Sequence, residues 1–299
     1  MIVPPRTAHR QTFILLHGRG SSAAKFGPGL LETHFPTANS VDLQARTQTL
    51  ALAFPHAKFI FPTAPRRRAA IYKRSIINQW FDCWHADEPG VNDWMMIDGL
   101  KETVSFLHEL LRDEIALVGS GRNVVLGGIS QGCAAAYVSM LLWDGEPLAA
   151  VLGICGYFPF QHEMRKAIEP DNFDSELDSF DPFERSDDEA DQPNPAPDPT
   201  LLEPAQRAAL FLRERLELGD GQSASELASA VRGTPFWAGH GTTDEKVPVR
   251  LGREAAACLR SMDVDVSWNE YEGLGHWYSE AMLAEFVAFL RNRTDWEQN

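Results

Sequence analysis

The stretch from residue 123 to residue 137 reads NVVLGGISQGCAAAY, and it constrains the fold more than any other part of the chain. An apolar run typical of a buried strand ends at two glycines, one serine follows, and an alanine-rich, helix-like segment begins. The small residues Gly128, Ser130 and Gly132 cost packing and backbone entropy. In an α/β sheet, ligands bind beyond the carboxyl ends of the strands. A serine on such a turn is therefore a candidate catalytic residue.

The rest of the chain alternates short β-like runs with helix-like segments. Most of the runs are almost wholly apolar, as strands buried on both faces of a parallel sheet are. The expected strands are 12–17, 58–61, 123–126, 149–154, 235–238 and 266–271. The expected helices include 97–111, 248–262 and 279–290. This order predicts an α/β fold of the doubly wound kind, with a mostly parallel sheet and helices on both faces.

One segment breaks the alternation. Residues 169–198 hold twelve Asp or Glu against one basic residue, Arg185, and carry eleven of the fifteen net negative charges. Such a composition cannot bury enough apolar surface to order itself, so we expect an acidic linker. A helix is expected next, with Pro204 near its start and Gly219 past its end. The predicted organisation is a core of residues 1–160 and 234–299, with 161–233 as an acidic linker and helical, lid-like insertion.

Charge and cysteine content exclude several classes of protein. A net charge of −15 argues against a nucleic-acid partner. Four separated cysteines with no CxxC pair indicate free thiols rather than a zinc site or a disulfide framework. No stretch approaches the roughly 20 apolar residues of a membrane span, and prolines interrupt the N-terminal region where a signal peptide needs its apolar core. We expect a cytoplasmic protein without metal or cofactor; the sequence leaves a homodimer open.

Three residues in separate loops form the candidate catalytic set. Residues 128–132 fit the G-x-S-x-G pattern of a nucleophile elbow, so Ser130 is the candidate nucleophile. A serine needs a base and an orienting carboxylate, and α/β hydrolases place them in the order Ser, acid, His. Asp244 and His276 each follow a predicted strand and keep that order. Glu245 is the alternative acid, while His240 precedes the acid and is expected to brace its loop.

The tetrahedral intermediate of acyl transfer also needs two backbone N–H donors. One is expected from Gln131, directly after the nucleophile, and the other from the glycine-rich loop LHGRGS after the first long strand. In that loop, Arg19 is the candidate donor.

These stretches resemble the acyl-protein thioesterase/carboxylesterase (phospholipase/carboxylesterase) family of α/β hydrolases. The resemblance lies in LLHGRG (15–20), FPTAP (61–65), QWFD (79–82), LGGISQG (126–132), TPFWAGHGTTDEKVP (234–248) and YEGLGHW (271–277). It implies triad roles for Ser130, Asp244 and His276, oxyanion amides at Arg19 and Gln131, and a place for Trp80 near the acyl pocket. The run LHGRGS followed by KFGPGLL is similar to fungal members in particular.

The chain also departs from the family pattern, which usually has an apolar residue at Arg19, a second glycine at Cys133, a small residue at Trp277 and no long insertion. These departures bear on the substrate, and Trp80, Arg19 and Trp277 are the substrate-binding candidates. Five basic residues within 66–74 either attract an anionic substrate or form a solvated loop face.

The leading hypothesis is a serine hydrolase that acts on an ester or thioester of a small molecule or an acylated partner. The alternatives are acyl transfer or product release in a biosynthetic pathway with the same triad, and a non-catalytic binding protein on the same fold.

Overall fold

A seven-stranded sheet forms the centre of the computed structural model, which describes residues 1–37, 47–84, 90–169, 201–219, 228–294 and 296. The strand order is β1-β5-β2-β8-β9-β10-β11, and every pairing is parallel except that of β1 with β5. The strands of this sheet are β1 (Ile2–Val3), β2 (Gln11–Leu16), β5 (Ala57–Ile60), β8 (Val124–Ile129), β9 (Ala150–Ile154), β10 (Phe236–Gly241) and β11 (Val266–Tyr271).

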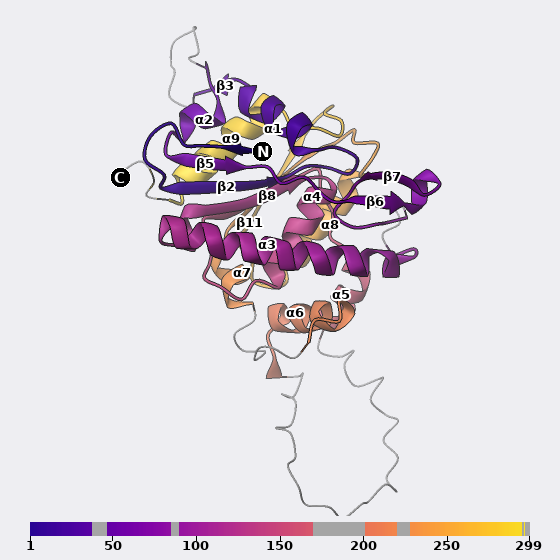
Figure 1. Cartoon of the computed structure of the whole chain (residues 1–299). Helices are drawn as coiled ribbons and strands as arrows, with labels where there is room; N and C mark the ends of the chain where they lie inside the picture. Colours follow the sequence, from indigo (N-terminus) through magenta and orange to yellow (C-terminus); the bar gives the residue numbers. More distant parts are fainter. Residues whose placement is uncertain (38–46, 85–89, 170–200, 220–227, 295, 297–299) are drawn as a thin grey trace, which may run out of the picture.

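The apolar character of the strands follows from burial on both faces. Successive side chains of a strand point to opposite faces, and in β2 Phe13 and Leu15 belong to one apolar cluster while Ile14 and Leu16 belong to the other. Helices α1 (Ala23–Glu32), α2 (Leu50–Ala53) and α9 (Glu280–Arg291) cover the first face, above the sheet in Figure 1. The sheet is therefore the middle layer of three.

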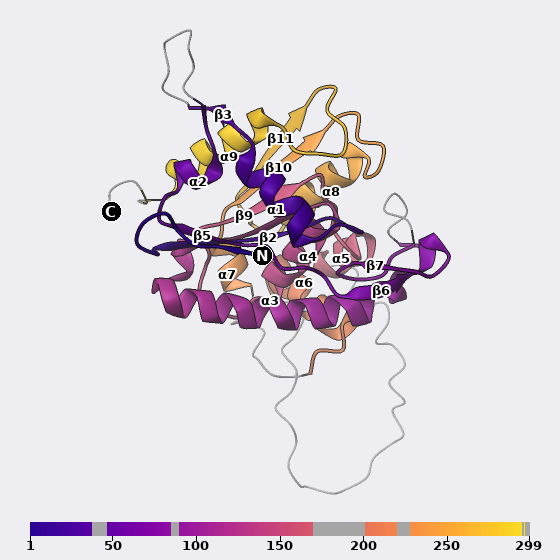
Figure 2. The same cartoon turned by 45° about the horizontal axis from the view of Figure 1, so that its top comes forward.

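The opposite face carries the larger helical layer. It consists of α3 (Ile97–Val118), α4 (Gln131–Leu141), α5 (Gln161–Ile168), α6 (Pro204–Arg215), α7 (Ser229–Gly233) and α8 (Val249–Arg260). Figures 1 and 2 both place α6 outside α4, on the side away from the sheet. Short 3₁₀ turns, η2 (Asp93–Met96) and η3 (Gly121–Asn123), flank α3.

Two hairpins stand outside the main sheet. One pairs β3 (Phe35–Pro36) with β4 (Thr47–Gln48). The other pairs β6 (Arg66–Ala69) with β7 (Ser75–Asn78) through the turn η1 (Ala70–Tyr72), and it projects to the right in Figure 1. The basic run of residues 66–74, for which a solvated loop face was one of the two interpretations, is thus one strand and the tip of a hairpin.

Strand register brings the candidate loops to one edge. Leu16 pairs with Gly128, and Gly128 pairs with Gly153. Gly239 in turn pairs with Ile154, and Gly241 pairs with Tyr271. Because these parallel strands end side by side, the loops that follow β2, β8, β9, β10 and β11 leave the sheet together.

The predicted fold class is confirmed, and the six expected strands and the long helices are all present. Most bounds agree within a few residues, but α3 continues to Val118, well beyond its expected end at residue 111. The helix expected after Pro204 is α6, and its apolar side is buried against the core beneath the sheet. Most of the acidic linker, residues 170–200, lies outside the described residues, so its expected character stays a prediction. Among the described residues, none of the helices has the length and apolar composition to span a membrane.

Candidate active site

Ser130 lies in a sharp turn between β8 and α4. Its backbone has φ 58° and ψ −123°, a conformation that L-residues rarely adopt, and its N–H donates to Ile154 O at 2.8 Å. The neighbouring glycines are required by close backbone contacts: a Cβ on Gly128 would lie 2.6 Å from the carbonyl carbon of Gly132, and one on Gly132 would lie 2.4 Å from Leu16 O. The small residues therefore allow the turn to pack against the end of β2. Ser130 then lies at the carboxyl edge of the sheet, where the active-site cavity opens.

Asp244 and His276 come together from two different loops. Asp244 follows β10 and is only 6% exposed, while His276 follows β11 and is half-buried. His276 Nδ1 lies 2.7 Å from Asp244 Oδ2, and an ionised carboxylate can only accept, so Nδ1 carries the proton. His276 Nε2 is then a lone-pair acceptor. The exposed neighbour Glu245 has no such contact with His276 in the described part of the chain.

The Asp244 carboxylate has four N–H donors. Oδ1 accepts from the backbone of Lys246 and Val247, both at 2.9 Å, while Oδ2 accepts from His276 and contacts His240 Nε2 at 3.2 Å. Burial by itself raises the pKa of Asp244, but the hydrogen bonds from His240, His276 and Val247 outweigh it and lower the pKa below its ordinary value. The carboxylate is therefore ionised at neutral pH and keeps His276 in one tautomer.

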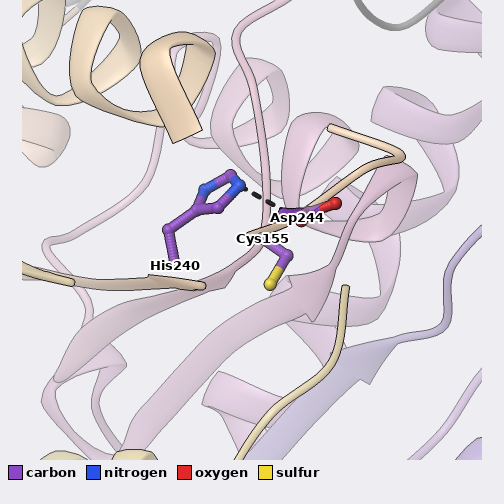
Figure 3. A group of neighbouring side chains, drawn as sticks. All are labelled: Cys155, His240 and Asp244. Carbon is purple, nitrogen blue, oxygen red and sulfur yellow. Dashed lines mark ion pairs between the residues drawn. The ribbon is translucent and has the colours of Figure 1, made fainter. Parts of the chain in front are cut away.

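His240 braces Asp244 from behind, as Figure 3 shows. Its Nε2 also lies 2.8 Å from Val247 O, and both neighbours of Nε2 are acceptors, so Nε2 carries the proton. Cys155 completes a buried group in which one ligand atom of each residue lies within 4.8 Å of the others. This group does not fit a metal, because the Asp244 oxygens are already occupied and burial raises the pKa of the Cys155 thiol to about 12.

The loop after β2 lies directly beside the serine. A Cβ on Gly18 would be 3.4 Å from Ser130 Cβ. The backbone N–H groups of Arg19 and Gln131 have no protein acceptor among the described residues, and the N-terminus of α4 adds its positive dipole end at Gln131. These two amides have the chemistry of donors to a developing oxyanion.

A buried network holds this loop in place. Ala64 N–H donates to His17 Nε2 at 3.0 Å, so His17 Nδ1 carries the proton and donates to Gly18 O at 2.7 Å. Burial lowers the pKa of His17, which keeps the ring neutral. Trp80 Nε1 donates to His17 O at 2.8 Å, and Trp80 N–H donates to Gln131 Oε1 at 3.0 Å. Trp80 thus contacts both candidate oxyanion segments, one through its indole N–H and the other through its backbone N–H.

A cavity of about 580 Å³ opens at this edge of the sheet. Among the predicted residues, the cavity is lined by Ser130, His276, Arg19, Gln131 and Trp277. Asp244 lies behind His276, and Trp80, which is 1% exposed, lies beneath the loop rather than in the lining. Two of the three substrate-binding candidates, Arg19 and Trp277, therefore line the cavity. The third, Trp80, supports the loop after β2 through its hydrogen bond to His17 O.

Further lining residues include Tyr157 and also Tyr72 and Cys83, which sequence reasoning missed as parts of the site. Tyr72 lies at the tip of the β6–β7 hairpin, Cys83 follows β7, and Tyr157 follows β9. Arg19 Nη1 lies 3.0 Å from Cys83 Sγ, and the Arg19 guanidinium lies 5.3 Å from the centre of the Tyr72 ring. Tyr72 and Cys83 lie in or after a hairpin that the sequence did not predict, so no signal in the sequence indicated them.

This sheet, with a serine in a strained strand-to-helix turn and an Asp–His pair beside it, has the architecture of the α/β hydrolases. The Phospholipase/Carboxylesterase family profile matches residues 1–172 and 220–294. The chain therefore belongs to the phospholipase/carboxylesterase family. Residues 173–219, which lie between the two matched parts, include α6.

Curated relatives and solved structures agree with this family. An acyl-protein thioesterase 1 of Yarrowia lipolytica is 29% identical over 159 residues, which span 53% of this chain and 62% of that protein. An acyl-protein thioesterase 1 of Gibberella zeae is 22% identical over 295 residues, 98% of this chain and 94% of that protein. The crystal structure of Zea mays acyl-protein thioesterase 2 superposes with a TM-score of 0.64 at 20% identity, covering 98% of this chain and 97% of that one, which shows the shared fold.

Proposed function

We propose that this chain is a serine hydrolase that cleaves carboxylic esters or thioesters through an acyl-enzyme on Ser130. The observation that carries the proposal is the shared cavity of Ser130 and His276, with His276 Nδ1 donating to the buried Asp244. The relatives named acyl-protein thioesterase and carboxylesterase support the same reaction class. Among described residues, the site has the parts that acyl transfer to a serine needs and that a binding protein does not.

The proposed reaction runs in two halves. Ser130 Oγ attacks the acyl carbon as His276 Nε2 takes the hydroxyl proton, and the negative oxygen of the tetrahedral intermediate accepts from the N–H groups of Arg19 and Gln131. His276 then gives its proton to the departing alcohol or thiol, which leaves the acyl-enzyme. A water molecule repeats the attack with His276 as base, and its products are the carboxylic acid and free Ser130.

Two further proposals concern the setting of this reaction. Residues 1–160 and 234–299 form the catalytic core, and 161–233 form an insertion; the described part of the insertion packs against α3 and α4 and contributes no residue to the cavity lining. A cytoplasmic location is supported by the four cysteines, all of which are buried free thiols.

The test combines covalent labelling with site variants. The protein is incubated with a fluorophosphonate probe beside Ser130→Ala, His276→Ala and, as a matched control, Ser105→Ala on the exposed side of α3. Label on Ser130 is expected in the wild type and in Ser105→Ala, and it should be lost or strongly slowed in the other two. A folded wild-type protein that takes no label and hydrolyses neither 4-nitrophenyl hexanoate nor a hexanoyl thioester would overturn the proposal.

A further inference from the structure

Arg19 places a positive charge in the wall of the cavity. In the described part of the chain, its guanidinium contacts the thiol and carbonyl of Cys83 at 3.0 and 3.4 Å and lies over the Tyr72 ring, and no carboxylate pairs with it. The side chain is partly buried. A guanidinium carries five N–H donors in a rigid fork, and withdrawing it from water without a counter-charge is unfavourable. Within the described residues, N–H donors of this guanidinium therefore remain available to an anion.

The sheet order fixes the side of the serine on which this charge lies. Strands β2 and β5 lie on one side of β8, whereas β9, β10 and β11 lie on the other. Arg19 follows β2, and its partner Cys83 comes from the segment after β5, while His276 follows β11. Because His276 must protonate the leaving group, the leaving group departs on the β10–β11 side. The side of Ser130 away from β10 and β11, where Arg19 lines the cavity, remains open to the acyl group.

Most of the other charged residues in and beside the cavity are basic. Lys25 of α1 also lines the cavity and is exposed. On the leaving-group side, Glu245 and Lys246 are adjacent and largely cancel each other. The hairpin that contributes Tyr72 to the cavity lining also exposes four basic residues: Arg66, Arg68, Lys73 and Arg74. A cluster of one sign beside a cleft draws oppositely charged substrates toward it.

We infer that the acyl group of the substrate carries a carboxylate, which the Arg19 guanidinium binds while Ser130 attacks the ester or thioester carbon. This inference rests on the proposed function and adds the substrate class. The planar fork of Arg19 matches a carboxylate in a two-bond contact, which an ammonium group does not reproduce. The Tyr72 ring and the Cys83 contact hold the guanidinium in place at one end of the cavity.

The experiment compares two esters with the same leaving group and acyl chains of six carbons. These are 4-nitrophenyl hydrogen adipate, which ends in a carboxylate, and 4-nitrophenyl hexanoate, which ends in a methyl group. The measured quantity is the ratio of their kcat/KM values, after subtraction of spontaneous hydrolysis. A charge-assisted hydrogen bond to the carboxylate predicts a ratio about tenfold or more higher in the wild type than in Arg19→Leu. Any effect of the substitution on the Arg19 backbone amide acts on both esters and cancels in the ratio.

Two variants test the specificity of the effect. Arg19→Lys keeps the charge but loses the fork, so its ratio is expected between those of the wild type and Arg19→Leu. Arg112→Leu removes an exposed arginine of α3 that pairs with Asp144 and lies outside the cavity lining, and the wild-type ratio is expected to persist. The wild-type preference should also fall as salt concentration rises.

The outcomes separate the inference from the proposed function. Hydrolysis of both esters through Ser130, with the same ratio in wild type and Arg19→Leu, would overturn the inference and leave the hydrolase standing. A preference that depends on Arg19 but appears only when the carboxylate is moved to the leaving group, as in 3-carboxy-4-nitrophenyl hexanoate, would also overturn it. A protein that hydrolyses neither ester and takes no fluorophosphonate label would overturn both.

Discussion

Replacing Asp244 with asparagine tests whether this carboxylate sets the tautomer of the catalytic histidine. The carboxylate accepts at both oxygens, with the backbone of Lys246 and Val247 on Oδ1 and His276 on Oδ2. An asparagine has only one acceptor oxygen. If that oxygen keeps the two backbone bonds, the NH₂ group faces His276 Nδ1, and the ring satisfies it only by moving its proton to Nε2. The nitrogen that should take the serine proton is then already protonated.

The expected loss in kcat is about 10⁴-fold, the size seen when the acid of a serine-protease triad is made neutral. At about 1.36 kcal/mol for each factor of ten, this corresponds to roughly 5 kcal/mol of transition-state stabilisation. The assay is the initial rate of 4-nitrophenyl hexanoate hydrolysis at pH 7.5, with the rate of fluorophosphonate labelling as a second readout. Both are expected to fall together, while circular dichroism spectra remain those of the wild type.

Glu245→Gln is the matched control, because Glu245 is the adjacent acid and is exposed. Its kcat is expected to stay within a few-fold of the wild type. The reasoning is wrong if folded Asp244→Asn keeps more than a tenth of the wild-type kcat. It is equally wrong if Glu245→Gln takes the large loss instead.

Three further predictions concern stability and are measured by urea unfolding. Gly132→Ala should lower the free energy of unfolding by about 1–3 kcal/mol, because the new Cβ would lie 2.4 Å from Leu16 O. An unchanged midpoint of urea unfolding would contradict this close packing. Leu212 lies in the buried face of α6, and Leu212→Ala should lower the free energy of unfolding by about 2–5 kcal/mol. The control Glu214→Ala, at an exposed position of the same helix, should change it little. Equal effects of the two substitutions would show that α6 does not pack against the core. The lowered pKa of Asp244 stabilises the fold above the ordinary Asp pKa of about 3.9, and this contribution is lost as pH falls below it. The stability gap between wild type and Asp244→Asn should therefore hold from pH 5 to 7 and shrink toward pH 3, and a gap that is unchanged at pH 3 would refute it.

The central strands could be predicted because burial on both faces leaves long apolar runs, which the sequence displays directly. The placement of Ser130 could also be predicted, since a sharp turn pressed against β2 requires glycines on either side. Helix α1 could not, because Gly27, Pro28 and Gly29 argue against a helix. Tertiary packing overrides that preference: a Cβ on Gly27 would already lie 3.0 Å from the ring of Phe61.

The parts of the site that could not be predicted from the sequence are contacts between segments far apart in the chain. The β6–β7 hairpin is largely exposed, so its pattern of burial is weak and its five basic residues hide the strand. The contact of Arg19 with Cys83 joins residues 64 positions apart. The glycines beside Arg19 indicated its backbone N–H as a candidate oxyanion donor, and its departure from the family pattern made it a substrate-binding candidate. The direction of its side chain depends on how the hairpin folds beside it.

The residues of the site come from two separate stretches of the chain, which lie on different strands of the sheet. The serine, the candidate oxyanion amides and Arg19 are all encoded before residue 160, and the acid and the histidine are encoded after residue 234. Strand β9 lies between the two sets in the sheet, so substitutions in the early loops can change the Arg19 side of the cavity without touching the acid or the histidine. The proton relay, inherited in the last quarter of the chain, need not change with it.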